Sequence, residues 1–150
     1  MKKFFKILFF FTVLTACNYE PIFSSKDIGF SISNIKVINE SYLTRQIKRS
    51  LKEFQNLNEG KIYTIEFNVE KTDVITAKDS KGNAKSFKTK IICNLMVYEN
   101  KRLVKSKKII ENFTYNNVSD KFKLTKYKSN IENNLINRII EKIILELYSL

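Results

Sequence analysis

Apolar side chains recur at every fourth position toward the end of the chain. The row consists of Tyr127, Ile131, Leu135, Ile139, Ile143 and Leu147, flanked by Leu124, Ile136, Ile140 and Ile144. Such a broad apolar face at helical spacing predicts a long helix over 120–148 that packs on a sheet. Charged residues such as Glu132 and Glu141 interrupt it, so a membrane span of about 20 apolar residues is not expected.

Alternating apolar and polar positions predict strands in the rest of the chain. The alternation covers 30–38, with an irregularity near Asn34, and then 62–72, 86–98 and 102–115. Between the first two strands, Ser41 precedes apolar residues at helical spacing, which predicts a capped helix over 42–55 that ends at 56–60. The stretches 79–83 and 99–101 are typical of turns.

This order, β-α-β-β-β-α, predicts an α+β fold. Two helices would pack on one face of a four-stranded, mostly antiparallel sheet. The length of 150 residues is that of one domain, and the alternation places this domain at 30–150.

The predicted strand 86–98 has an unusual outward row. Lys88 and Lys90 alternate with the core positions, but Ile92, Met96 and Tyr98 continue the same row. An exposed apolar row beside a basic one is typical of a surface that contacts a partner. Cover by a loop is the alternative.

The N-terminus has the proportions of a secretory signal. Lys2, Lys3 and Lys6 precede or interrupt an apolar run that ends at Leu14. The stretch "LTAC" resembles the lipobox of bacterial lipoproteins, in which cleavage precedes a cysteine that receives lipid. We therefore expect a signal peptide over 1–16, diacylglyceryl and N-acyl lipid on Cys17, and a tether over 17–29. The alternative is an ordinary cysteine near a conventional cleavage site.

The chain is strongly basic, with 27 basic and 15 acidic residues and a formal charge of +12. Such a charge favours anionic partners. Codon bias toward lysine in an A+T-rich genome is an alternative source of it. Only four of the basic residues are arginine, the residue that reads bases by bidentate contacts, and the signal indicates export. Nucleic-acid binding is therefore not expected.

Catalytic and metal-binding patterns are absent from the sequence. There is no histidine, and no C-x-x-C, G-x-G-x-x-G or P-loop pattern occurs. Glu66 and Glu70 share one face of a predicted strand, but nothing in the sequence marks a cleft around them. An enzyme that acts on envelope polymers is therefore only a minor alternative. We expect no enzyme, metal or cofactor, and Cys93 is expected in the core.

Several stretches resemble the LPS-assembly lipoprotein (LptE) family of alphaproteobacterial type. The start "CNYEPIF" is similar to the family's C-G-F-x-P-L-Y, although Asn18 replaces the usual glycine. The stretches "SYLTRQIKRSLKEF", "KGNAKSFKTKIICNLMV" and "NFTYNNVSDKFKLTKYKSNIENNLINRIIEKI" follow in the family's order. The resemblance covers nearly the whole chain.

The resemblance implies a lipoprotein of the outer membrane, anchored on its periplasmic side. Members plug the barrel of LptD, assist its assembly and bind lipopolysaccharide during its insertion at the cell surface. The family's basic residues in the turn before the long strand and just before the final helix correspond to Lys81 and Lys126. Lys85, Lys88, Lys90 and Lys123 are further candidates by proximity. An auxiliary periplasm-facing binding module of another envelope transport system is the alternative function.

Overall fold

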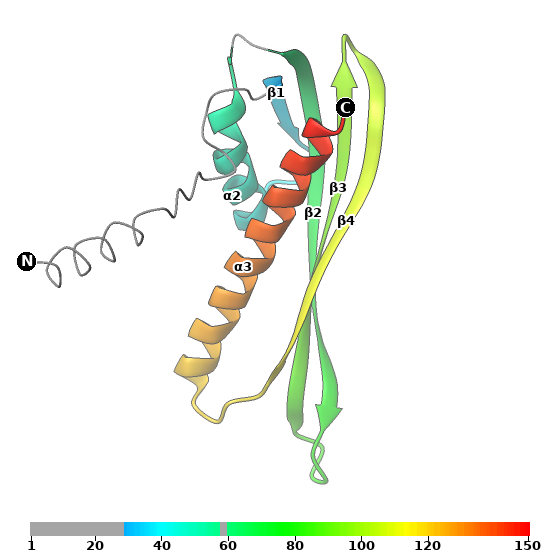
Figure 1. The fold of residues 1–150 in the computed structure, drawn as a ribbon. Helices are drawn as coiled ribbons and strands as arrows, with labels where there is room; N and C mark the ends of the chain where they lie inside the picture. The colour runs from blue at the N-terminus through cyan, green and yellow to red at the C-terminus, as the bar shows by residue number, and fades with distance from the viewer. Residues whose placement is uncertain (1–28, 58–59) are drawn as a thin grey trace, which may run out of the picture.

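The computed structural model describes residues 29–57 and 60–150 (Figure 1). The predicted signal peptide, Cys17 and the tether up to residue 28 lie outside the described residues. The elements follow in the order β1 (Phe30–Val37), α2 (Tyr42–Leu51), the 3-10 helix η2 (Lys52–Phe54), β2 (Lys61–Lys78), β3 (Ala84–Glu99), β4 (Arg102–Asn116) and α3 (Lys121–Tyr148).

The four strands form one mixed sheet in the order β1-β2-β3-β4. β1 runs parallel to β2, while β2, β3 and β4 pair antiparallel. The register of β1 shifts between Ile32 and Asn34, where the sequence predicts an irregularity. Both helices lie on the same side of the sheet (Figure 1). The predicted α+β fold, with two helices on a mostly antiparallel sheet, is confirmed.

The core lies between the helices and the inner face of the sheet. The strands contribute buried side chains such as Ile65, Phe67, Ile91 and Leu95, and α3 contributes the apolar row that predicts it. Cys93 is fully buried among them, and burial raises the pKa of its thiol to about 12. The expectation that Cys93 is a core residue is confirmed.

The helix after β1 begins as predicted and ends earlier. Ser41 and Thr44 form a capping box, in which the hydroxyl of Ser41 accepts from the backbone N–H of Thr44. The α-helix stops at Leu51, and 52–54 continue as one 3-10 turn. Asn56 then adopts a φ of 58°, which turns the chain toward β2.

β2 is longer than the predicted 62–72. It continues to Lys78, because Val74 pairs with Lys88 and Ile75 with Phe87 across the hairpin. The alternation is hidden there because Lys71 and Asp73, instead of apolar residues, occupy the inward positions. The turns at 79–83 and 99–101 are confirmed.

The outer face of the sheet carries no helix or loop from the described part of the chain (Figure 1). Ile92, Met96 and Tyr98 of β3 are half-buried between their neighbouring strands, while Ile110 on β4 is 42% exposed. Between these apolar side chains stand polar ones, including Asn68, Asn94 and Asn112 on paired strands. The predicted mixed apolar and basic face is therefore open.

Candidate functional site

Positive charge is concentrated at one end of the domain, here called the basic end. It consists of residues 78–90, around the β2–β3 turn, and 117–128, at the start of α3. These two segments contain nine lysines and two aspartates, a net charge of +7. The turn and the first turns of α3 lie at the same end of the molecule (Figure 1).

The β2–β3 turn is built around Asp79. Its carboxylate accepts hydrogen bonds from the backbone N–H groups of Lys81, at 2.9 Å, and Asn83, at 2.8 Å. Gly82 supplies the φ of 84° that the turn requires. The side-chain and backbone hydrogen bonds from Asn83 hold the pKa of Asp79 below its usual range. The turn therefore presents Lys81 on a tip of defined shape.

The loop before α3 is attached to the start of β3. Asn117 donates its backbone N–H to the Lys85 carbonyl at 2.8 Å and its amide Nδ2 to the Ala84 carbonyl at 2.7 Å. Asp120 then caps α3 by accepting from the backbone N–H groups of Phe122 and Lys123. These contacts hold the loop before α3 against the start of β3, so that α3 begins at the same end of the sheet as the β2–β3 turn.

Both aspartates of the basic end are thus engaged with backbone N–H groups. Within the described residues, the only ion pair that a lysine of this end forms is the one between Lys123 and Asp120, at 3.8 Å. Lys81, Lys85, Lys123 and Lys126 are exposed. Of these, Lys81, Lys85 and Lys126 form no ion pair with another described residue, so their ammonium groups are available to an anionic ligand.

The structure brings some of the predicted lysines together and separates others. Lys81, Lys85, Lys123 and Lys126 share the basic end. The resemblance implies that Lys126 lies just before the final helix, but in the structure it lies within α3. Lys88 and Lys90 also belong to this end by sequence, but they lie on the outer face of β3. Cys17 lies outside the described residues.

Lys128 is a basic residue that the sequence interpretation missed. Its ammonium lies 4.8 Å from the centre of the Phe87 ring, a cation–π contact between α3 and β3. Lys78 and Lys121 complete the basic end. The lysine-rich run "KFKLTKYK" could have pointed to Lys121 and Lys128 as basic candidates. The contact of Lys128 with Phe87 could not have been predicted, because the two residues are forty-one positions apart in the sequence.

Exposed apolar side chains accompany these lysines. Phe122 is 80% exposed, and Tyr127 and Phe113 are each about two-fifths exposed. Phe113 and Tyr127 line a groove of about 380 Å³ between β4 and α3, with Ile131 and Leu135 among its apolar lining residues and Asn130, Asn134 and Arg138 among its polar ones. The basic end therefore adjoins a partly apolar groove.

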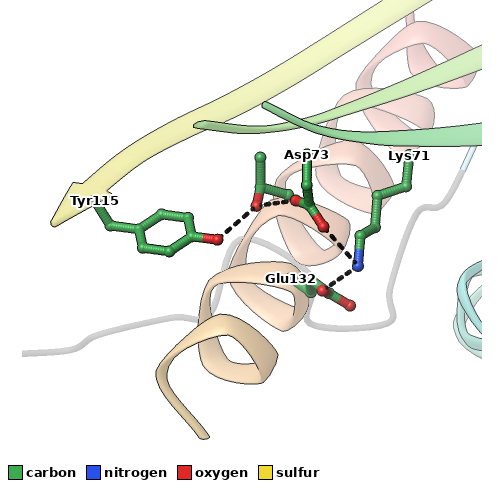
Figure 2. Close-up of polar contacts among 5 residues, drawn as sticks. Lys71, Asp73, Tyr115 and Glu132 are labelled. Carbon is green, nitrogen blue, oxygen red and sulfur yellow. Dashed lines mark hydrogen bonds and ion pairs between the residues drawn. The ribbon is translucent and has the colours of Figure 1, made fainter. Parts of the chain in front are cut away.

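A polar cluster lies on the inner face of the sheet beneath this part of α3 (Figure 2). The Lys71 ammonium donates to the carboxylate of Glu132 and lies 3.4 Å from Asp73. The Thr89 hydroxyl donates to Asp73 at 2.5 Å and lies 3.4 Å from the Tyr115 hydroxyl. The cluster thus joins β2, β3 and β4 to α3.

Charge pairing maintains this cluster. Burial alone would lower the pKa of Lys71, but the hydrogen bond and charge of Glu132, together with Asp73, raise it above its ordinary value. Nearby on β4, the buried Glu111 is paired with Lys142 and lies 3.9 Å from Arg138. Polar contacts thus join α3 to β2 and β4 along the edge of the apolar core.

Two further features are absent from the described residues. No three side chains of the metal-binding acidic, cysteine and histidine types are grouped closely enough to hold a metal ion. None of the described helices is both long and apolar enough to cross a bilayer.

Comparison with known proteins shows the fold. No protein-family model matches the sequence, and no curated protein matches it. The rare lipoprotein B of Shewanella oneidensis superposes with a TM-score of 0.62 at 13% identity, covering 79% of this chain and 94% of that one. This chain has the fold of that lipoprotein.

Two further lipoproteins are similar. A lipoprotein B of Nitrosomonas europaea gives a TM-score of 0.61 at 8% identity and covers 77% of this chain and 80% of that one. The minor lipoprotein of Acinetobacter baumannii gives a TM-score of 0.57 at 11% identity and covers 79% of this chain and 91% of that one. At such identities the similarity concerns the architecture of the domain.

Proposed function

We propose that this protein is an outer-membrane lipoprotein of the LptE type, anchored through lipid on Cys17 on the periplasmic side. It plugs an LptD-like β-barrel, assists assembly of that barrel and binds lipopolysaccharide as it moves to the cell surface. Its fold, shared with bacterial lipoproteins, and its lipobox-like "LTAC" support the proposal. Its role is in binding and not in catalysis.

The basic end carries the proposal. It combines nine lysines with exposed Phe122 and with the partly apolar groove beside Tyr127. Lipopolysaccharide is an anionic amphiphile, so its phosphates require cations and its acyl chains require apolar surface. Lysine on a turn suits a phosphate because its compact ammonium can reorient around the ligand.

The outer face of the sheet supports the role of a plug. It presents polar side chains such as Asn94 and Asn112 among apolar ones such as Ile92 and Ile110. The interior of a membrane barrel is polar, so a face of mixed polarity is compatible with its wall.

Lipid A binding tests the role of the basic end. Changing Lys81 and Lys126 to Glu replaces two attractive charges by repulsive ones, and we expect affinity for lipid A vesicles to fall at least tenfold. The matched control changes Arg45 and Lys108 to Glu, since both are exposed and lie outside the basic end. Unchanged affinity in the Lys81/Lys126 variant, with a normal unfolding temperature, would contradict this assignment.

The alternative function is an auxiliary periplasm-facing module of another envelope transport system. A basic end that binds anionic lipid is compatible with it as well. The two functions differ in the partner, because only the plug requires a large β-barrel in a one-to-one complex.

A further inference from the structure

The described chain begins at the end of the domain opposite the basic end. The Gly29 carbonyl accepts a hydrogen bond from the Lys61 N–H at 3.2 Å, and the ring of Tyr148 contacts Phe30 edge-on with centres 5.0 Å apart. Glu99, next to the β3–β4 turn, pairs with Tyr63 near the start of β2. The starts of β1 and β2, the β3–β4 turn and the end of α3 are therefore neighbours (Figure 1).

A second patch of basic and apolar residues lies at this opposite end. It consists of Lys61, Ile62, Lys101, Arg102 and Leu103, all of them exposed, and is called the Lys101 patch. The exposed fractions of its apolar side chains are large, 60% for Ile62 and 48% for Leu103. Asn100 and Lys101 have φ angles of 48° and 68°, as in the tight turns that join antiparallel strands.

The charge around this patch is positive. Lys101 lines a hollow of about 410 Å³ with Lys36, Glu66 and Tyr98 on the outer face. Glu66 and Glu99 are the acidic residues near the patch on these strands, against the three basic residues of the patch and Lys36. Exposed cations beside exposed aliphatic side chains are typical of surfaces that rest on anionic membranes.

The length of the preceding chain places this end near the lipid anchor. Gly29 follows Cys17 by twelve residues. Twelve residues span at most about 40 Å, at about 3.3–3.6 Å per residue when fully extended. The basic end lies roughly 50 Å from the Lys101 patch, because the sixteen-residue strand β3 separates the two ends. Of the two charged ends, the Lys101 patch is therefore the one close to the attachment point.

We propose that the Lys101 patch rests on the anionic phospholipid headgroups of the leaflet that holds the anchor. Lys101 and Arg102 contact phosphates, while Ile62 and Leu103 enter the interface between headgroups and acyl chains. The Lys61 ammonium donates to the Leu150 carbonyl, so Lys61 adds positive charge beside the contact. The contact orients the domain with its basic end away from that leaflet. This inference rests on the lipid anchor of the proposed function, but not on the barrel.

Tryptophan fluorescence of the lipidated full chain in vesicles tests the contact, because the chain has no tryptophan of its own. Leu103→Trp places a probe in the patch, and Phe122→Trp places a matched probe in the basic end. The vesicles contain brominated lipid in phosphatidylcholine, with or without phosphatidylglycerol. With phosphatidylglycerol, we expect bromine to quench the Leu103→Trp probe at least twice as strongly as the Phe122→Trp probe.

Charge reversal isolates the cause of that difference. Adding Lys101→Glu and Arg102→Glu should reduce quenching of the Leu103→Trp probe at least twofold, whereas adding Arg45→Glu and Lys108→Glu should leave it unchanged. Equal quenching of the two probes, or quenching insensitive to reversal at Lys101 and Arg102, overturns the proposal. Because the vesicles contain no barrel, failure to capture a barrel elsewhere would contradict the plug and leave these readouts unaffected.

Discussion

The two halves of α3 differ in what holds them against the sheet. From Ile131 to Leu147, eight side chains are buried in the core. From Lys121 to Asn130 none is fully buried. This half is held by half-buried Leu124 against the core, by Tyr127 against Tyr115 and by Lys128 over Phe87. The polar cluster of Lys71 and Glu132 marks the transition between the two halves (Figure 2).

This difference predicts that stability varies along one helix. Buried apolar contacts are cooperative and costly to break, whereas exposed polar contacts open locally at low free energy. The second half of α3 therefore supports the fold. In the proposed function, the first half is the part whose lysines adjust to the ligand, at little cost to the core.

Truncation in the second half should have the largest effect. Ile139→Ala removes a fully buried side chain and should lower the free energy of unfolding by about 2–5 kcal/mol. Leu145→Ala is the matched control, because Leu145 lies on the same helix and is 60% exposed. Urea unfolding of both variants measures the difference, and similar losses would contradict the assignment of the core.

Loss of the α3 cap should have a smaller effect. Asp120→Ala removes the acceptor for the backbone N–H groups of Phe122 and Lys123, and should cost about 1 kcal/mol. Asp120→Asn keeps an acceptor and should retain most of the stability. Thermal unfolding separates the two variants, and an equal loss in both would indicate that the charge of Asp120 matters more than its hydrogen bonds.

Loss of the ion pair at the transition should have the smallest effect. Glu132→Gln should lower the free energy of unfolding by roughly 0.5–1 kcal/mol at pH 7, because the pair is partly exposed. The pKa of Lys71 is raised in the folded protein, so its contribution is complete below the unfolded pKa of about 10.4 and declines as the pH rises through the folded value.

Urea unfolding at pH 7 and pH 11 measures this dependence. The difference between the wild-type protein and Glu132→Gln should be smaller at pH 11. A difference that grows with pH would contradict the assigned pairing.

The apolar contacts of α3 and of the sheet were predictable from the sequence. The repeat from Ile131 to Leu147 and the alternation in 86–98 depend on local periodicity, which burial on one face imposes on helices and strands alike. The polar cluster around Lys71 and Asp73 was not predictable. Lys71 and Asp73 break the alternation of β2, and the partners that satisfy them, Glu132 and Thr89, are distant in the sequence.

Only part of the basic end was predictable, because it too depends on contacts between residues that are distant in the sequence. Lys81 and Lys126 were selected by resemblance, and composition showed that lysine is abundant. That the β2–β3 turn and the start of α3 lie at the same end of the domain is evident only from the structure, in which Asn117 is hydrogen-bonded to Lys85 and Ala84. The groove at Phe113 and Tyr127 likewise requires the relative position of β4 and α3.

Capture of the barrel tests the central claim most directly. Tagged full-length protein would be purified from detergent-solubilised outer membranes, and the proteins recovered with it would be identified and quantified by mass spectrometry. A plug predicts one large β-barrel protein at a ratio of about one to one. Recovery of the lipidated protein alone, or with inner-membrane transport components, would contradict the plug and favour the auxiliary module.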